Sequence, residues 1–205
     1  TTDSGATWAS LTASSRPIFG VGFTSATHAI AVGAGGATVS TDDAGINWAS
    51  LTSEALGVLN AVHVDNATSA VLFGDGTSLA RTTDAGASFK TITTLASGKV
   101  KDATFATAQR GYVLDSRNQL TRSDDGGITW KVLDLGGAKP AALLAPNEKT
   151  LLLVGGKDVR RSADAGLSFK SAGASKFRKQ KFRSVDRGKG ATVVYGDSAA
   201  ALSKD

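Results

Sequence analysis

The 205-residue chain contains no cysteine, no methionine and only two histidines. Without cysteine it has no disulfide, no thiolate metal ligand and no thiol nucleophile. Two histidines are too few for a multi-histidine metal centre, so we expect neither a metal nor another cofactor. No segment approaches the roughly 20 apolar residues needed to cross a bilayer, so a membrane span is not expected. Because methionine is absent, we interpret residue 1 as a position other than a translation start, in a processed or excised chain.

A short motif recurs along the whole chain. It reads Ser or Thr, any residue, Asp, any residue, Gly, two residues, then Trp or Phe. Its Asp positions, including a partial sixth copy at Asp205, are separated by 40, 41, 41, 39 and 41 residues. The five complete copies supply Asp3, Gly5, Trp8, Asp43, Gly45, Trp48, Asp84, Gly86, Phe89, Asp125, Gly127, Trp130, Asp164, Gly166 and Phe169. A motif with this period indicates a repeat architecture.

A second marker follows the same period. Four-residue apolar runs end at Gly33, Gly74, Asp115, Gly155 and Gly196. Their length, their β-branched residues and the turn-forming residues around them predict strands rather than helices. For one repeat we predict strands at about 59–64, 70–73, 78–82 and 88–93. Four strands in about 41 residues is typical of a β-propeller blade.

The ends of the chain suggest how the blades are completed. The last repeat holds three predicted strands, and residues 7–11 form a fourth strand without partners before the first full repeat. We therefore predict an all-β, single-domain, five-bladed propeller in which residues 7–11 complete the last blade, which removes the exposed sheet edges. The predicted blades are 13–53, 54–94, 95–135, 136–174, and 175–205 together with 1–12. The alternative is that these are five blades of a six- or seven-bladed parent.

The repeated motif resembles the Asp box, or BNR repeat, of sialidases, sortilin-type receptors, some xyloglucanases and photosystem II assembly factors. The resemblance implies that each box forms the hairpin between the third and fourth strands of a blade. Its carboxylate would accept backbone N–H groups across the turn, and its aromatic residue would pack between sheets. The box Asp residues are therefore interpreted as structural rather than catalytic or metal-binding.

The residues needed for catalysis are scarce, and we predict no catalytic residue. Glycosidase chemistry uses a pair of carboxylates, yet the only Glu residues, Glu54 and Glu148, fall in connections on opposite faces of the predicted ring. The tyrosines, Tyr112 and Tyr195, lie in apolar runs, where burial explains them. Acidic residues in the turns between second and third strands remain candidates for a carboxylate pair, although turn formation explains each. They are Asp75, Asp115, Asp158 and Asp197.

The charge of +5 is concentrated near the C-terminal end. Residues 157–189 contain 11 Lys or Arg against three Asp, while the rest of the chain is slightly acidic. Such a field attracts an acidic partner. The candidate binding residues are Arg16, Lys157, Lys176, Arg178, Lys179, Lys181 and Arg183. The alternative is that these cations form a solvated basic rim without a specific role.

These observations favour a binding scaffold similar to photosystem II assembly factors, which the resemblance implies is exported, periplasmic or lumenal and non-enzymatic. Its partner would be an acidic protein or peptide; an anionic glycan is a second candidate, and a nucleic acid is not favoured because the aromatic spacing does not suggest a stacking platform. One alternative is a carbohydrate-binding or glycosidase-like propeller. Another is an excised or engineered repeat module without a function of its own.

Overall fold

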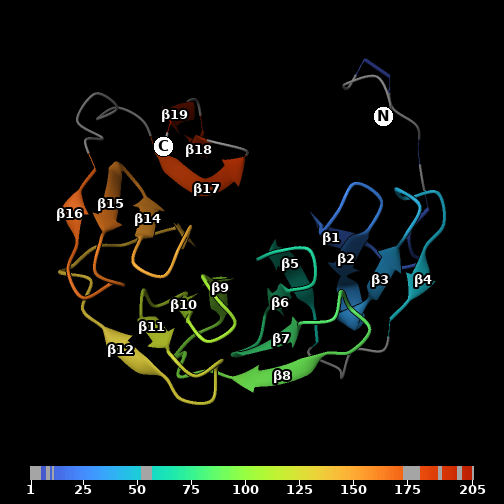
Figure 1. Ribbon diagram of the computed structural model, residues 1–205, viewed down its shortest axis with the longest axis horizontal. Coiled ribbons are helices and arrows are strands. Elements are labelled where there is room, and N and C mark those ends of the chain that lie inside the picture. Colours follow the sequence, from blue (N-terminus) through green and yellow to red (C-terminus); the bar gives the residue numbers. More distant parts are fainter. Residues whose placement is uncertain are drawn as a thin grey trace. The chain divides into compact units, whose positions relative to one another are not determined.

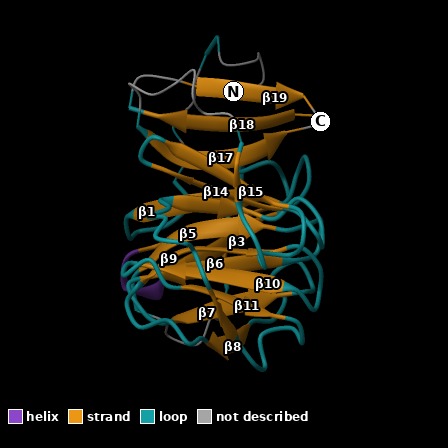
Figure 2. Cartoon of the chain, turned by 90° about the vertical axis from the view of Figure 1, so that its left-hand side faces the viewer, coloured by secondary structure: helices purple, strands orange, loops and turns teal. Residues whose placement is uncertain are grey.

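The computed structural model describes residues 6–7, 10, 12–51, 57–172, 181–188, 191–197 and 200–204. The all-β prediction is confirmed, because strands make up almost all of the regular structure in this part of the chain (Figure 2). A single short 3-10 helix, η1 (Ala34–Gly36), is found among the described residues. No helix there is long and apolar enough to cross a membrane.

The strands form antiparallel sheets in chain order (Figure 1). The first sheet contains β1 (Ile18–Phe23), β2 (Ala29–Gly33), β3 (Thr38–Thr41) and β4 (Ala49–Ser50). The second contains β5 (Leu59–Val64), β6 (Ala70–Gly74), β7 (Ser78–Thr82) and β8 (Lys90–Thr93). The third contains β9 (Val100–Phe105), β10 (Gly111–Asp115), β11 (Leu120–Ser123) and β12 (Lys131–Leu133). The fourth contains β13 (Ala142–Leu144), β14 (Leu151–Gly155), β15 (Asp158–Ser162) and β16 (Lys170–Ser171). The last contains β17 (Phe182–Gly188), β18 (Ala191–Gly196) and β19 (Ala200–Lys204).

The chain divides into two compact units, one of Thr1–Leu72 with Ala80–Lys90 and one of Phe73–Leu79 with Thr91–Asp205. The predicted fourth strand of the last blade, at 7–11, includes residues 8, 9 and 11, which lie outside the described part. Its pairing with the last sheet therefore stays a prediction, as do the single domain and the blade boundaries.

In the first three sheets the second strand, β2, β6 or β10, is buried along its whole length, as expected for a strand covered on both sheet faces. In the first unit Ile30 and Val32 of β2 pack in one cluster with Leu72 of β6. In the second unit Tyr112 of β10 packs in one cluster with Leu151 of β14. Within each unit, the core is thus formed by contacts between consecutive sheets.

Each described Asp box forms the turn between the third and fourth strands. At Asp125, one carboxylate oxygen accepts the Ser123 hydroxyl at 2.8 Å and the Thr129 N–H at 2.9 Å. The Ser123 oxygen in turn accepts the Gly127 N–H at 2.8 Å. The boxes at Asp43, Asp84 and Asp164 repeat these bonds. Asp3, Gly5 and Trp8, predicted as the first box, lie outside the described residues.

The glycine that ends three of the apolar runs is required by a close backbone approach. A methyl group on Gly155 would lie 2.6 Å from the Lys139 carbonyl oxygen, in the connection that enters the fourth sheet. A methyl group on Gly33 would likewise overlap the Pro17 carbonyl oxygen, and a methyl group on Gly196 would overlap the Lys181 carbonyl oxygen. The third sheet has Asp115 at this position, and its carboxylate accepts the Ser97 and Gly98 N–H groups of the corresponding connection. Either the close-packed glycine or the Asp115 carboxylate holds the connection against the second strand.

We predict that Gly155→Ala lowers the free energy of unfolding by about 1 to 3 kcal/mol, because the added methyl group overpacks against fixed backbone. The control is Gly137→Ala, where φ is +75° and nothing lies within 4 Å of the added methyl group. That change should cost about 1 kcal/mol through backbone conformation alone. Urea unfolding followed by tryptophan fluorescence measures both, and a smaller loss for Gly155→Ala than for Gly137→Ala would contradict the close-approach explanation.

Candidate binding surface

One end of the strands in the second unit carries most of its exposed cations. At this end lie the turns between second and third strands and the connections between consecutive sheets. We use the name basic end for the surface formed by five exposed cations, Arg117, Lys139, Lys157, Lys181 and Arg183. The box turns lie at the opposite end of the same strands.

Two of the predicted binding residues lie side by side. Gly156 forms an isolated antiparallel bridge with Phe182, and the Phe182 N–H donates to the Gly156 carbonyl oxygen at 2.6 Å. In antiparallel pairing the neighbours of bridged residues also face one another, so Lys157 lies beside Lys181. Both side chains are exposed, whereas Phe182 is 1% exposed. The bridge therefore joins cations from the fourth and last sheets.

The basic end continues across the third and fourth sheets. Lys101, at the start of β9, donates to the Pro140 carbonyl oxygen at 2.7 Å and lies 3.5 Å from the Asn118 side-chain oxygen. This links the turn that carries Arg117 to the connection that carries Lys139. The connection then meets the fourth sheet, where the Ala141 N–H donates to the Val154 carbonyl oxygen at 2.7 Å. The turns and connections that carry Arg117, Lys139, Lys157 and Lys181 therefore lie next to one another.

Some cations of this end are neutralised and others are not. Arg183 pairs with Asp197, and this bond lowers the pKa of the Asp197 carboxyl. Lys99 lies 3.4 Å from Asp75. Within the described part of the chain, the structure gives no ion pair for four members of the basic end, Arg117, Lys139, Lys157 and Lys181. Lys181 also interacts electrostatically with Asp197, so Arg117, Lys139 and Lys157 carry the charges most available to a partner.

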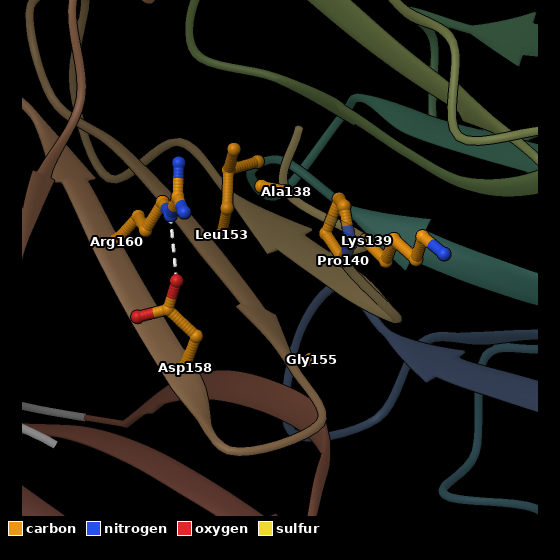
Figure 3. Close-up of a pocket in the computed structure, with 7 residues that line it drawn as sticks. All are labelled: Ala138, Lys139, Pro140, Leu153, Gly155, Asp158 and Arg160. Carbon is orange, nitrogen blue, oxygen red and sulfur yellow. Dashed lines mark hydrogen bonds and ion pairs between the residues drawn. The ribbon is translucent and has the colours of Figure 1, made fainter. Parts of the chain in front are cut away.

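A small hollow opens beside these cations (Figure 3). It is lined by Ala138, Lys139, Pro140, Leu153, Gly155, Asp158 and Arg160. Its volume of about 20 Å³ is enough for roughly one water molecule. The Arg160 guanidinium donates to Asp158 at 2.6 Å and to the Leu135 carbonyl oxygen at 3.1 Å, so it holds the loop in place. The hollow is too small to enclose a sugar ring.

The remaining predicted binding residues do not join this surface in the described part. Arg16 belongs to the first unit and donates to the Gly35 carbonyl oxygen at 2.8 Å, across the β2–β3 turn. Lys176, Arg178 and Lys179 lie outside the described residues. Arg117 and Lys139 were missed by the sequence analysis, which followed local charge density. Mapping every cation onto its turn within the repeat would have found both.

The acidic residues at this end serve the fold. Asp115 is fully buried and accepts hydrogen bonds from the Arg117 and Gln119 N–H groups as well as from the Ser97 and Gly98 groups. Desolvation opposes its ionisation, but the hydrogen bonds, led by that from Gln119, lower the pKa of its carboxyl below the ordinary value. Asp75, Asp158 and Asp197 pair with cations. The four candidate carboxylates are each held by separate partners.

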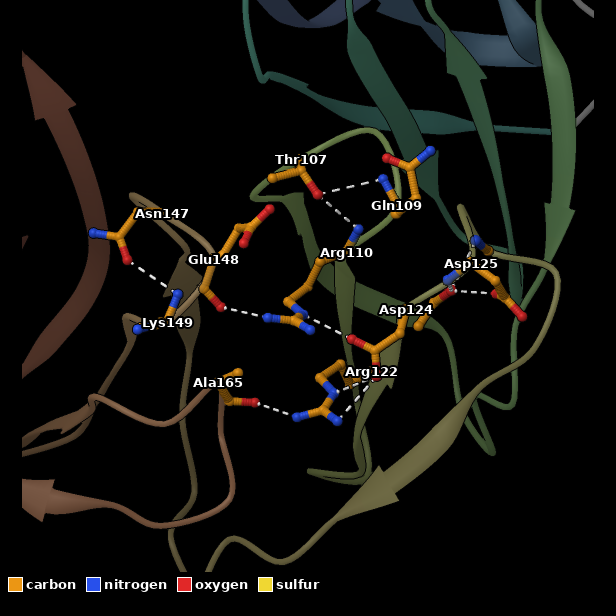
Figure 4. Close-up of polar contacts among 12 residues, drawn as sticks. Thr107, Gln109, Arg110, Arg122, Asp124, Asp125, Asn147, Glu148, Lys149 and Ala165 are labelled. Atoms are coloured by element: carbon orange, nitrogen blue, oxygen red, sulfur yellow. Dashed lines mark hydrogen bonds and ion pairs between the residues drawn. The ribbon is translucent and has the colours of Figure 1, made fainter.

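At the opposite end, two arginines converge on one carboxylate (Figure 4). Arg110 donates to Asp124 at 2.7 Å and to the Glu148 carbonyl oxygen at 2.9 Å. Arg122 donates to Asp124 at 3.0 Å and to the Ala165 carbonyl oxygen at 2.8 Å. These bonds join the third sheet to loops of the fourth, so the arginines connect sheets.

Neither tyrosine has the surroundings of a nucleophile. Tyr112 is fully buried within the cluster between the third and fourth sheets, and burial raises the pKa of its hydroxyl. Tyr195 is 44% exposed on β18. Among the described residues, no group of three or more His, Cys, Asp or Glu side chains could hold a metal ion.

One further carboxyl lies at the junction of the third and fourth sheets. Asp102 of β9 accepts the Leu143 N–H of β13 at 2.8 Å and the Ala103 N–H at 2.9 Å. Desolvation raises the pKa of Asp102 to about 7, although both hydrogen bonds favour the ionised form. Burial at the contact between β9 and β13 thus disfavours ionisation of Asp102.

Comparison with known proteins agrees with the repeat and the fold. The BNR/Asp-box repeat model matches residues 121–132, and no curated protein matches the chain. Among solved structures, YCF48 bound to D1 peptide matches with a TM-score of 0.66 and 16% identity, over 92% of this chain and 63% of that chain. YCF48 from Cyanidioschyzon merolae matches with a TM-score of 0.66 and 15% identity, over 82% of this chain and 60% of that chain. The GH74 enzyme of Niastella koreensis matches with a TM-score of 0.64 and 15% identity, over 92% of this chain and 30% of that chain.

At these identities the similarity shows the fold, which is that of an Asp-box β-propeller. The blade-like sheets predicted from the repeat are confirmed. The chain spans less than two thirds of the length of these three solved chains.

We predict that replacing Asp102 with Asn removes one component of the pH dependence of stability. Because the folded-state pKa of about 7 lies above the unfolded value of about 3.9, Asp102 favours folding most below pH ~4. This contribution is lost as the pH rises through about 7. Thermal unfolding of both proteins between pH 4 and 8 measures it. The wild type should lose stability relative to Asp102→Asn across this window, and a constant difference would contradict the raised pKa.

Proposed function

We propose that this protein is a non-enzymatic binding scaffold whose basic end recognises an acidic protein segment. The observation that carries the proposal is the row of exposed cations on neighbouring turns and connections, Lys139, Lys157 and Lys181, for which the described part of the chain gives no ion pair. Three sheets fix the backbone positions of this row and of Arg117, so its charges need little rearrangement to meet a partner. A field of this kind attracts anions and speeds their encounter with the surface.

The shape of the surface supports an extended partner rather than a small molecule. The hollow beside Lys139 has a volume of only about 20 Å³, whereas small-molecule sites usually measure ~300 Å³ or more. An acidic peptide lying across the turns would contact the row without needing a deep pocket. YCF48, which has the same fold, has been solved bound to a D1 peptide. That structure supports peptide binding as a use of this fold, and the acidic character of the segment is our proposal for this chain.

A carbohydrate-binding or glycosidase-like role is the second candidate, because GH74 enzymes share the fold. Such a role would use a pair of acidic groups beside an open site. The four acidic turn residues that could supply this pair are held by cations or backbone N–H groups. An anionic glycan would use the same basic end as a peptide. Binding of neutral oligosaccharides that is independent of salt would favour the carbohydrate role.

The proposed location is exported, periplasmic or lumenal. It rests on the resemblance to assembly factors and on the basic end as a place to bind a client protein. Detection of the protein in the soluble extracytoplasmic fraction of its source cells would support it. The remaining alternative, a repeat module without its own function, is favoured if neither acidic peptides nor glycans bind.

We predict that Lys157→Ala combined with Lys181→Ala weakens binding of a fluorescent peptide rich in Asp and Glu by roughly 3- to 10-fold. Two charges at an exposed surface each contribute up to about 1 kcal/mol. Wild-type affinity should also fall between about 50 and 300 mM salt, because exposed charges are screened over that range. Fluorescence anisotropy at both salt concentrations measures both effects.

The matched control is Lys131→Ala combined with Lys170→Ala. It removes the same charge from exposed lysines on the outer strands β12 and β16, so net charge alone cannot explain a difference between the two variants. The same peptide with Asn and Gln in place of its acidic residues should not bind. Equal losses in the two variants, or binding that persists at high salt, would overturn the proposed role of the basic end.

A further inference from the structure

Lys101 of β9 reaches out of its own strand at the basic end. Its amine donates to the Pro140 carbonyl oxygen at 2.7 Å, in the connection that enters the fourth sheet. The same amine lies 3.5 Å from the Asn118 side-chain oxygen, in the turn between β10 and β11. Asn118 directly follows Arg117, and Pro140 directly follows Lys139. One amine therefore lies between the two segments that carry these cations.

The turn that carries Arg117 is held by its own hydrogen bonds. The buried Asp115 carboxylate accepts the N–H groups of Arg117 and Gln119 at 2.9 and 2.7 Å. Between them Asn118 has a φ of +64°, in the left-handed region that Asn enters more readily than most residues. The backbone that carries the Asn118 side chain is thus fixed on both sides.

The connection that carries Lys139 is held from two directions. Toward the fourth sheet, the Ala141 N–H donates to the Val154 carbonyl oxygen at 2.7 Å. Toward the third sheet, the Pro140 carbonyl oxygen accepts the Lys101 amine. Pro140 has no N–H, so this carbonyl is its one backbone hydrogen-bonding group. The Lys101 bond therefore ties the connection to the third sheet one residue away from Lys139.

The Lys101 amine is used within the chain. Lys101 as a residue is exposed, but partial burial of its amine lowers the pKa of that group, and the charge of Asp115 opposes the change. Arg117 and Lys139 are exposed, and the structure gives them no ion pair among the described residues. Lys101 is therefore suited to positioning, and these two cations are suited to contact with a partner.

We propose that Lys101 is a positioning residue of the basic end, which holds the Arg117 turn against the Lys139 connection so that both cations bind one partner together. This inference rests on the function proposed above. It adds that the acidic segment presents anionic groups to Arg117 and Lys139 at the same time. Two cations that are fixed before binding reduce the ordering cost of forming the complex.

The test is a double-mutant cycle measured with the peptide rich in Asp and Glu. Lys101→Met keeps an unbranched side chain but removes the amine, and it should weaken binding by roughly 2- to 10-fold. In a protein that already carries Arg117→Ala and Lys139→Ala, the same change should alter binding by less than about 2-fold, because no pair of cations is left to position. A Lys101 that only adds its own charge would cost the same in both backgrounds. Fluorescence anisotropy measures all four proteins.

A second readout needs no partner. Amide nitrogen relaxation should show more nanosecond backbone motion at 117–119 and 138–139 in Lys101→Met than in the wild type. The box turn at 124–128 serves as the internal control and should not change. Circular dichroism confirms that the variant is folded.

A charge-neutral variant tests the same contact if Lys101→Met does not fold. Asn118→Gly removes the side-chain oxygen near Lys101 and leaves every charge in place. Glycine also adopts the positive φ of this position without strain. It should weaken peptide binding in the wild-type background but not in the protein that lacks the Arg117 and Lys139 charges.

The outcomes separate this inference from the proposed function. Equal losses from Lys101→Met in both backgrounds, or unchanged backbone motion beside it, would overturn the positioning role and leave the proposed function standing. A wild-type protein that binds no acidic peptide would overturn the proposed function and this inference with it.

Discussion

The hydrogen-bonded box turn is the interaction on which the rest of the structure depends. In each described copy a carboxylate and a Ser or Thr hydroxyl satisfy the N–H groups of the turn between the third and fourth strands. These turns also contact the preceding sheet, since a methyl group on Gly166 would lie 2.7 Å from Leu133. The box turn thus fixes the link between the third and fourth strands of a sheet and also the contact of that sheet with the preceding one. It explains why the acidic residues of the motif are committed to structure.

The two ends of the strands consequently have different roles. At the box end, Arg110 and Arg122 are bound to Asp124 and to backbone carbonyls of the neighbouring sheet. At the other end, backbone contacts at Gly155 and the carboxylate of Asp115 hold the connections, so Lys139, Lys157 and Lys181 are not needed for that purpose. Binding residues commonly lie on such turns above a rigid scaffold. A propeller can therefore carry a charged surface at one end without weakening its sheets.

Most of the fold could be predicted from the sequence, because box spacing and apolar runs report local turn and strand chemistry directly. The strand predicted at 59–64 is β5, and those at 70–73 and 78–82 match β6 and β7. The basic end was only partly predictable. Lys157 and Lys181 are 24 residues apart in the chain, and only the bridge between Gly156 and Phe182 makes them neighbours. The pairing of Arg183 with Asp197 likewise depends on which strands meet.

The most direct test of the central claim, that the basic end is the recognition surface, is to map the contact by NMR. An acidic peptide is titrated into the isotope-labelled protein, and the backbone amide shifts are followed at low and at high salt. The account predicts shifts concentrated at Arg117, Lys139, Lys157 and Lys181 that disappear as salt screens the charges. Shifts confined to the box turns, or a salt-independent pattern elsewhere, would contradict it.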